Sequence, residues 1–371
     1  MSAKAPIMLA AGGTGGHLFP AEALASVLTA RGYDVVLATD ERVLQHSTQF
    51  APDHVFMIPS ATFKSRHPLA LLATGFRLAS GFVTALRVIR QVRPAAVVGF
   101  GGYPTVPPVL AAWLLGVPCV LHEQNGVLGR ANRFLAAKVR AIGTGFERVK
   151  GLDGILASKA RFVGNPLRPA VMRAIRPFPA LVGEGVFELL VTGGSQGARI
   201  MSDCVPEAVA LLPEALRRRL HIVQQARAED VERVRAIYAA SGVHAEVAAF
   251  FMDLPERLAN AHLVIGRAGA STVAELAAIG RPSILVPLPH SLDNDQAANA
   301  SFLAEAGAAD VIKQSAFTPQ RLSQRLHHYM IDIKSLTDSA QSAKKRGITD
   351  GAERFADLVL DIVGTEGRSS Q

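Results

Sequence analysis

The residues that decide the fold are IMLAAGGTGGHLFPAEALA at 7–25, where a short apolar run ends in a glycine-rich turn and continues as a helical stretch. A second copy of this arrangement, FELLVTGGSQGARI, begins at Phe187. An apolar strand that leads through glycines into a helix is typical of the turn that opens a Rossmann-like domain. Its recurrence predicts two such domains in one chain.

Short apolar runs alternate with helical stretches on both sides of each turn, which predicts parallel, doubly wound sheets. Strands are expected at 7–11, 35–38, 55–58, 95–99 and 117–121, and again at 188–191, 221–225, 245–249, 263–266 and 283–286. The last helices are expected at 319–330, 333–345 and 352–362, with no regular structure after Gly364. The boundary between the halves is expected in the proline- and arginine-rich segment 164–179.

Composition limits the class of protein. The 371 residues are 49% hydrophobic and 19% charged, which suffices for two cores, and the single Trp argues against a carbohydrate-binding module with tryptophan platforms. Cys119 and Cys204 lie in apolar surroundings, which favours free thiols over a disulfide. No Cys/His cluster has the spacing of a zinc site. Prolines and glycines interrupt the uncharged stretch 94–121, which indicates buried α/β pieces rather than a membrane span.

The net charge of +8 is unevenly distributed. No acidic residue lies between Asp53 and Glu123, although six basic ones do, Lys64, Arg66, Arg77, Arg87, Arg90 and Arg93. Such a stretch attracts phosphate, on nucleic acid or on an anionic membrane, or it is a solvated face. The segment 69–93 has apolar side chains beside arginines, which suits either a surface that lies on anionic lipid or ordinary core packing.

Both glycine-rich turns suit an anion, because glycines admit a close approach and the following helix offers free N–H groups. In the first turn, His17 has the chemistry of a general base, although it could also be an ordinary helix N-terminal residue. In the second turn, Ser195 adds a hydroxyl donor. Neither turn has the lysine of a P-loop, and the first lacks the spacing of a dinucleotide fingerprint.

Three further motifs follow apolar runs. GRAGASTVAE at 266–275 places Glu275 in the first turns of a helix, where a carboxylate can accept from both ribose hydroxyls or simply favour the helix dipole. HEQNG at 122–126 is a polar cluster at the end of an expected strand. The segment 293–295, Asp-Asn-Asp, resembles the metal-binding motif of some sugar transferases, but a role in capping the helix 296–306 accounts for its carboxylates, so no metal is expected there.

Together these motifs resemble the MurG family of bacterial glycosyltransferases, which is glycosyltransferase family 28. The similarity extends in order over nearly the whole chain. It rests on GGTGGHLFPAEALA at 12–25, GFGGYPTVPP at 99–108, HEQNGVLGRANR at 122–133, VGNPLR at 163–168, GGSQGAR at 193–199, RAGASTVAE at 267–275 and DNDQAANA at 293–300.

The resemblance implies a GT-B fold, in which two Rossmann-like domains with parallel sheets face each other across a cleft. It implies a metal-independent, inverting transfer of GlcNAc from UDP-GlcNAc to the 4-hydroxyl of the muramoyl sugar of lipid I, the undecaprenyl-diphosphate-linked acceptor, to form lipid II. It further implies no cofactor, no nucleic-acid partner, a peripheral position on the anionic cytoplasmic face of the inner membrane, and membership of a cell-wall synthesis complex.

With this resemblance, we assign 1–165 to an acceptor- and membrane-facing domain and 166–345 to a UDP-GlcNAc-binding domain. The segment 346–371 is expected to form a helix that packs back on the first domain, and a tail. The residues that carry over as donor contacts are Thr14, Gly15, Gly16, Asn125, Arg168, Ser195, Phe251, Ala270, Ser271, Thr272, Val273, Ala274, Glu275 and Gln296.

For the catalytic base, His17 is preferred and Glu123 is the rival. The chain departs from the family pattern at Phe251, within AFFMDLP, and at Asp295, where relatives often carry a different polar residue. Position 295 is therefore assigned no role.

Three alternatives remain open from the sequence. The first is another enzyme on the same fold, such as a UDP-sugar epimerase or a transferase for a different acceptor. The second is a membrane-surface protein that binds the nucleotide only as a regulatory ligand. The third is a nucleic-acid binder, which the charge alone suggests and which the absence of interleaved aromatic and basic residues disfavours.

Overall fold

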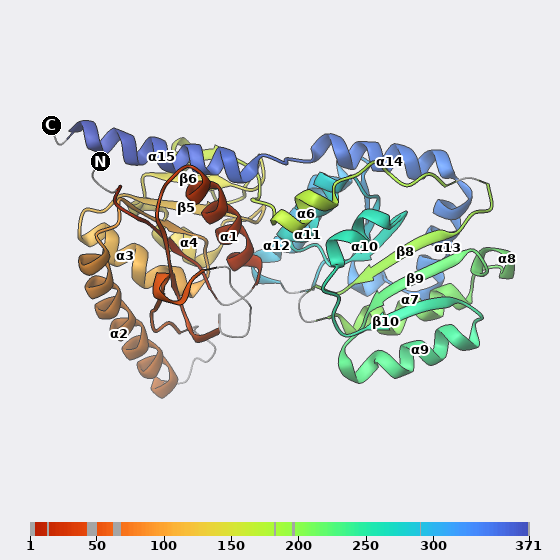
Figure 1. Cartoon of the computed structure of the whole chain (residues 1–371). Helices are drawn as coiled ribbons and strands as arrows, with labels where there is room; N and C mark the ends of the chain where they lie inside the picture. The colour runs from red at the N-terminus through yellow and green to blue at the C-terminus, as the bar shows by residue number, and fades with distance from the viewer. Residues whose placement is uncertain are drawn as a thin grey trace. The chain divides into compact units, whose positions relative to one another are not determined.

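The computed structural model describes residues 4–12, 15–42, 50–61, 68–181, 183–194, 197–289 and 291–369, without the side chains of 68–73, 292 and 366–369. Its contacts divide the chain into two compact units (Figure 1). The first comprises Met1–Arg168 together with Thr349–Gln371, and the second comprises Pro169–Ile348. Each unit is an α/β domain with its own parallel sheet, which confirms the predicted fold class.

In its described residues, the first unit has a seven-stranded parallel sheet in the order β3-β2-β1-β4-β5-β6-β7. The chain order reverses direction between β1 and β4, and ligands of such sheets bind in the crevice at that point. The strands are β1 (Ile7–Ala10), β2 (Val35–Thr39), β3 (Val55–Met57), β4 (Ala96–Gly99), β5 (Cys119–Glu123), β6 (Ala141–Thr144) and β7 (Ala160–Phe162).

Helices cover both faces of this sheet. The α-helices are α1 (Gly15–Ala30), α2 (Pro68–Val92), α3 (Val106–Leu114), α4 (Arg130–Leu135), α5 (Ile155–Lys159) and α15 (Gly351–Ser369), with 3₁₀ turns η2 (Pro52–His54), η3 (Tyr103–Thr105) and η4 (Ala136–Lys138). The expectation of an unstructured tail after Gly364 was wrong, because α15 continues to Ser369. The uncharged stretch 94–121 folds as β4, η3, α3 and part of β5, as predicted.

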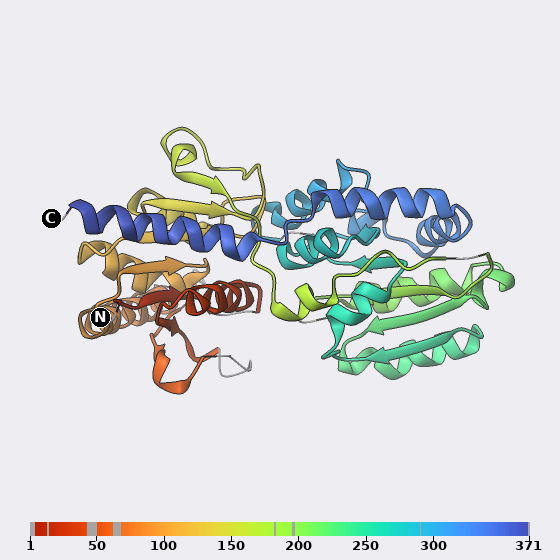
Figure 2. The ribbon, with the colours of Figure 1, turned by 45° about the horizontal axis from the view of Figure 1, so that its top comes forward.

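Alternation along β1 separates two cores. Ile7 and Leu9 pack with residues of α1 and α15, whereas Met8 and Ala10 pack with residues of α2 and α3. Successive side chains of a strand point to opposite faces, so a strand covered on both faces is apolar at every position. The α15 helix, which lies beside α1 (Figures 1 and 2), therefore completes the core of the first unit although it follows the second unit in sequence.

The second unit has a parallel sheet in the order β10-β9-β8-β11-β12-β13, which repeats the order of the first six positions of the other sheet. Its crevice lies between β8 and β11. The strands are β8 (Phe187–Thr192), β9 (Leu220–Gln225), β10 (His244–Ala248), β11 (Leu263–Gly266), β12 (Ser283–Leu285) and β13 (Ala309–Val311).

The helices of this unit pack in two groups. In the first, α7, α9 and α13 share one apolar core with β8 and β9, and in the second, α10, α12 and α14 contact α11. They are α6 (Pro169–Ala174), α7 (Arg199–Ala210), α8 (Glu214–Arg217), α9 (Val231–Ala240), α10 (Leu254–Asn260), α11 (Ala270–Ile279), α12 (Asp295–Ala304), α13 (Pro319–Ile331) and α14 (Ile333–Arg346), with 3₁₀ turns η5 (Ala228–Asp230), η6 (Leu292–Asn294) and η7 (Gln314–Ala316).

Two further expectations concern the class of protein. Cys119 and Cys204 are buried free thiols, as predicted, and burial raises the pKa of each to about 12. Within the described residues, no helix combines the length and the apolar character that a bilayer span requires.

Candidate functional site

The first glycine-rich turn joins β1 to α1 in the crevice of the first sheet. The helix begins at Gly15, so His17 belongs to its first turn instead of preceding it. A neighbouring turn after β4 also contains glycines, of which Gly101 and Gly102 have φ of 84° and 72°. A Cβ on Gly102 would lie 3.4 Å from His17 Nε2, so the histidine ring and this turn are neighbours. Thr14 lies outside the described residues.

The His17 ring is held in one orientation by the backbone. Its Nδ1 lies 2.8 Å from the carbonyl oxygen of Phe100, and Gln124 donates to the same oxygen through Nε2 at 2.7 Å. Because a carbonyl can only accept, Nδ1 carries the proton and Nε2 is the basic nitrogen. Burial lowers the pKa of His17, the hydrogen bond to Phe100 opposes that shift, and the charge of Arg42 adds to it. The ring is therefore neutral at pH 7 and able to accept a proton at Nε2.

Glu123 ends β5 and is 1% exposed. Its carboxylate accepts from the Asn125 N–H at 3.0 Å, the Gly129 N–H at 2.9 Å and Asn132 Nδ2 at 2.8 Å. Desolvation raises the pKa of Glu123 in spite of these donors. Both oxygens are engaged, so the geometry favours Glu123 as the group that orders the 124–129 loop and leaves His17 as the stronger candidate for the base.

His122, the preceding residue of β5, points to the other face and is 0% exposed. Its Nε2 donates to the carbonyl oxygen of Gly164 at 3.1 Å, and its ring lies 4.8 Å from that of Phe355 and 5.9 Å from that of Phe100. Burial lowers the pKa of His122 to about 4. The side chain therefore belongs to the core between β5 and α15.

This burial predicts a loss of stability in acid. The unfolded chain binds a proton at His122 below pH 6.5, and the folded chain does not until about pH 4, so the free energy of unfolding falls as pH decreases through that window. We expect the protonation of His122 in the unfolded chain to lower the free energy of unfolding by about 2 kcal/mol between pH 7.5 and pH 5. Urea unfolding of wild type and His122→Gln at both pH values measures it. Equal losses in the two proteins would contradict the assignment.

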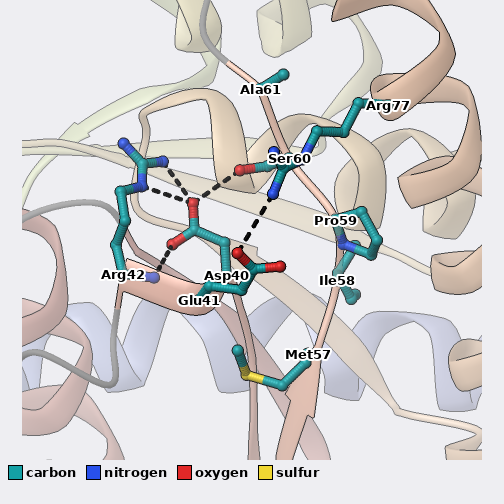
Figure 3. Close-up of a pocket in the computed structure, with 9 residues that line it drawn as sticks. All are labelled: Asp40, Glu41, Arg42, Met57, Ile58, Pro59, Ser60, Ala61 and Arg77. Carbon is teal, nitrogen blue, oxygen red and sulfur yellow. Dashed lines mark hydrogen bonds and ion pairs between the residues drawn. The ribbon is translucent and has the colours of Figure 1, made fainter. Parts of the chain in front are cut away.

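A polar pocket of about 400 Å³ adjoins the first glycine-rich turn (Figure 3). At its base, the Asp40 carboxylate accepts from Arg42 Nε and from the Ser60 hydroxyl, both at 2.8 Å. A Cβ on Gly12 would lie 3.3 Å from an Asp40 oxygen, which places the pocket beside the turn. The pocket thus presents an arginine, oriented by a buried carboxylate, beside the turn that leads into α1.

Arg168 is the last of the predicted site residues in the first unit. Its guanidinium carbon lies 4.5 Å from the centre of the Phe19 ring on α1. That ring in turn covers Gly15, where a Cβ would come within 2.8 Å of it. Arg168 therefore lies beside the N-terminal turn of α1, as an anion-binding role would require.

The second glycine-rich turn joins β8 to α7 in the crevice of the second sheet. A Cβ on Gly193 would lie 2.1 Å from the Ala198 nitrogen, so only glycine fits. Gly194 has a φ of 80°, and its N–H donates to the Thr192 hydroxyl. Ser195 lies outside the described residues, as does Gln196.

The motif at 266–275 follows β11 and opens α11. Gly269 is the N-cap and supplies no side-chain hydrogen bond, so the first N–H groups of the helix remain available to a ligand. Ala270, Val273 and Glu275 are buried, whereas Ser271, Thr272 and Ala274 are partly exposed.

Two more predicted donor contacts lie in neighbouring loops. Gln296 Oε1 accepts from the Leu288 N–H at 2.9 Å and so fixes the loop between β12 and α12. Phe251 is buried before α10, with the Arg257 guanidinium 4.4 Å from its ring centre. Both positions follow strands of the same sheet at their carboxyl ends, where a nucleotide would bind.

The Asp-Asn-Asp segment differs from its predicted form. The helix α12 begins at Asp295 instead of Gln296, and its N-cap is Asn294, which is left-handed and makes no side-chain capping bond. Asp295 accepts from the Gln296 N–H at 2.7 Å. Within the described part of the chain, no group of three or more His, Cys, Asp and Glu side chains is placed to hold a metal ion.

Each unit thus gathers its own predicted residues. Gly15, Gly16, His17, Glu123, Asn125 and Arg168 belong to the first unit, and Phe251, 270–275 and Gln296 belong to the second. Sequence reasoning gave no role to Gln124, Asn132 or Arg42. The polar run at the end of β5 and the charged run after β2 were the available signals. The partner of Gln124, however, is Phe100, 24 residues away, and only the fold brings Arg42 and Asp40 beside the first glycine-rich turn.

Comparisons with known proteins agree with this architecture. The model of the glycosyltransferase family 28 N-terminal domain matches residues 7–144, and that of the C-terminal domain matches 188–355. A Methylobacterium sp. (strain 4-46) protein, the UDP-N-acetylglucosamine–N-acetylmuramyl-(pentapeptide) pyrophosphoryl-undecaprenol N-acetylglucosamine transferase, is 56% identical over 357 residues, covering 96% of each chain. The protein of the same name from Bradyrhizobium sp. (strain ORS 278) is 53% identical and covers 98% of this chain and 100% of its own.

Among solved structures, MurG of Acinetobacter baumannii matches with a TM-score of 0.77 and 30% identity, over 96% of this chain and 99% of its own. The UDP-GlcNAc 2-epimerase of Neisseria meningitidis matches with a TM-score of 0.66 but only 12% identity, over 96% and 100% of the two chains, and shares the fold alone.

Two parallel-sheet domains, each with a glycine-rich turn at its crevice, define the GT-B class of sugar-nucleotide enzymes. The two domain models and the full-length relatives define the group within that class. The chain belongs to glycosyltransferase family 28.

Proposed function

We propose that the chain transfers GlcNAc from UDP-GlcNAc to the 4-hydroxyl of the muramoyl sugar of lipid I, forming lipid II for peptidoglycan, with inversion at the anomeric carbon. The observation that carries this proposal is the identity of 52–56% with N-acetylglucosamine transferases named for this acceptor, over nearly the full length. The neutral His17 in the crevice of the first sheet supplies the base that such a transfer requires.

We assign the donor to the second unit. The start of α11, which has no side-chain cap, offers N–H groups to the diphosphate, and we assign to Glu275 on the same helix the role of accepting from the ribose hydroxyls. Phe251 and Gln296 flank this site. We assign Phe251 as an apolar surface for the uracil ring of UDP and Gln296 as the group that shapes the loop after β12. Ser195 adds a donor by its place in the sequence.

We assign the acceptor and the base to the first unit. His17 Nε2 takes the proton of the acceptor hydroxyl as its oxygen bonds to the anomeric carbon of GlcNAc. The bond from that carbon to the UDP oxygen breaks, and UDP leaves with the electron pair. Because the transfer is a single displacement, the anomeric configuration inverts. Arg42, oriented by Asp40 beside the first glycine-rich turn, suits an anionic group of the acceptor.

UDP departs as an anion, and its charge must be stabilised as it forms. We assign this task to the N–H groups of the helix starts, to Ser195 and to Arg168, with no metal ion. Arg168 has a position compatible with this role beside α1.

The direct test of the function is transfer of labelled GlcNAc from UDP-GlcNAc to a lipid I analogue, with and without EDTA. We expect labelled disaccharide-lipid at equal rates in both conditions. Free labelled sugar epimer without any lipid product would support an epimerase instead, and nucleotide binding without either product would support a regulatory ligand site.

The base assignment predicts the behaviour of His17→Gln. The amide can retain the hydrogen bond to Phe100 but cannot accept a proton, so we expect kcat to fall by about 10²–10⁴-fold with little change in the KM for UDP-GlcNAc. In wild type, the acid limb of the pH–rate profile should reflect a pKa below 6.5. A kcat within twofold of wild type would place the base elsewhere.

We propose that the first unit also holds the membrane surface. Trp113 on α3 and Phe134 on α4 are exposed apolar side chains that share one cation, and we call them the α3–α4 patch. Phe76 and Val83 on α2 and Leu114 on α3 are exposed as well. Lys138 Nζ lies 4.9 Å from the Phe134 ring centre and 5.7 Å from that of Trp113. Apolar side chains with cations beside them suit the headgroup region of an anionic bilayer. This patch supports a peripheral position on an anionic membrane, and the resemblance to family 28 leads us to assign it to the cytoplasmic face of the inner membrane.

Sedimentation with vesicles of one-quarter phosphatidylglycerol tests the patch. We expect the double variant Trp113→Ser, Lys138→Glu to lose most of its vesicle binding, because both the apolar and the electrostatic contributions decrease. Ile331→Ser, which removes an equally exposed apolar side chain at the end of α13, is the matched control and should bind as wild type does. Undiminished binding of the double variant would contradict the proposed surface.

A further inference from the structure

Arg281 lies just beyond α11 in the second unit and is 0% exposed. Its guanidinium donates only to backbone carbonyl oxygens. Nε and Nη2 reach Ala259, Nη1 reaches Ile279 at 3.0 Å and Gly280 at 2.9 Å, and Nη2 also reaches Pro177 at 3.1 Å. A single buried side chain thus joins the end of α10, the end of α11 and the segment 175–181.

The charge of Arg281 has its counterpart in these helix ends. The last carbonyl groups of a helix lack partners within it and carry the negative end of the helix dipole, so a cation there is stabilised. Both α10 and α11 terminate on Arg281, and Lys344 donates to the Ala278 carbonyl oxygen at 2.6 Å beside it. Burial lowers the pKa of Arg281 to about 10, so the group is still charged at pH 7.

The opposite ends of the same two helices carry the residues that we assign to the donor. Phe251 precedes α10, and 270–275 open α11. An α-helix rises about 1.5 Å per residue, so the ten residues of α11 span about 15 Å from the donor end to Arg281. Any shift of the two helix ends at Arg281 would change how their N-terminal ends present to a nucleotide.

The segment 175–181 is held against α10 by a second arginine. Arg176 donates to Glu256 Oε2 at 3.0 Å, to the Glu256 carbonyl oxygen at 3.0 Å and to Asn260 Oδ1 at 2.6 Å. This segment lies soon after Arg168, where the chain passes from the first unit to the second. The connection between the units is therefore fastened to the C-terminal end of a helix that we assign to the donor site.

We propose that Arg281 is a positioning residue for donor binding, which fixes α10 and α11 relative to each other and to the chain that enters the second unit. It touches no substrate. The proposal rests on the donor assignment made under the proposed function, but it concerns UDP binding alone and needs no acceptor. It goes beyond the transfer reaction because it makes the affinity for UDP, at the N-terminal ends of α10 and α11, depend on a side chain at their C-terminal ends.

The test compares Arg281→Gln and Arg281→Lys with wild type. Calorimetry measures the Kd for UDP, and steady-state assays with a lipid I analogue measure kcat and both KM values. For Arg281→Gln we expect about a tenfold or larger increase in the UDP Kd, a parallel increase in the KM for UDP-GlcNAc, and an unchanged acceptor KM. Arg281→Lys keeps the charge with fewer donors and should give an intermediate Kd.

Arg219→Gln is the matched control. This arginine is in the same unit and also donates to carbonyl oxygens, those of Gly183 and Gly185, but it joins no helix end to the donor site. It should bind UDP as wild type does. A merely structural role for Arg281 would lower the melting temperature of Arg281→Gln and leave its UDP Kd unchanged, and that result would overturn the proposal.

Hydrogen exchange on wild type keeps the test decisive if Arg281→Gln does not fold. UDP should slow exchange of the amides at 276–281, at the far end of α11, as well as those at 270–275. Protection that ends at Glu275 would overturn the proposal. If UDP binds and Arg281→Gln weakens it, but no sugar is transferred, the proposed function fails and the positioning role stands.

Discussion

The hydrogen bond between His17 Nδ1 and the Phe100 carbonyl oxygen is the interaction on which the catalytic account depends. It determines which imidazole nitrogen can act as a base. The acceptor of this bond is itself fixed, since the Phe100 ring is fully buried and lies 5.8 Å from that of Phe355 on α15. The C-terminal helix therefore supports the base from the core, although it follows the second unit in sequence and contributes nothing else that we assign to the site.

The two units use the same topology for different tasks. Both sheets reverse strand order at the central pair, and both carry a glycine-rich turn on the first strand of that pair. In the first unit this turn opens a helix with a neutral histidine in its first turn. In the second unit the corresponding crevice offers the uncapped start of α11 and a carboxylate one turn further on. The repeated strand order gives both sites, and side chains of different chemistry separate the proton transfer from nucleotide binding.

Much of this could be predicted from the sequence, because glycine-rich turns and apolar periodicity are local signals. The strand expected at 117–121 continues to Glu123, and His122 and Glu123 are buried in it. Their polarity ended the expected strand at residue 121, since the Gly164 carbonyl that accepts from His122 is 42 residues away and the Asn132 amide that donates to Glu123 belongs to the next helix. The short strands β6, β7 and β13 were missed because their sequences, AIGT, ARF and ADV, contain no run of three apolar residues, whereas the equally short β3, VFM, was predicted. The role of Arg281 depends on hydrogen bonds to residues distant in sequence. Arg42 bonds to Asp40, two residues away, but only the fold brings this pair beside the first glycine-rich turn.

The tautomer of His17 is the most direct test of the central claim. Nitrogen-15 NMR of protein labelled at histidine, with His17→Gln to identify the signal, distinguishes a protonated from an unprotonated ring nitrogen. The account predicts a neutral ring at pH 7 that is protonated at Nδ1 and free at Nε2, with a pKa below 6.5. A ring protonated at Nε2, or a fully protonated imidazolium at pH 7, would contradict it.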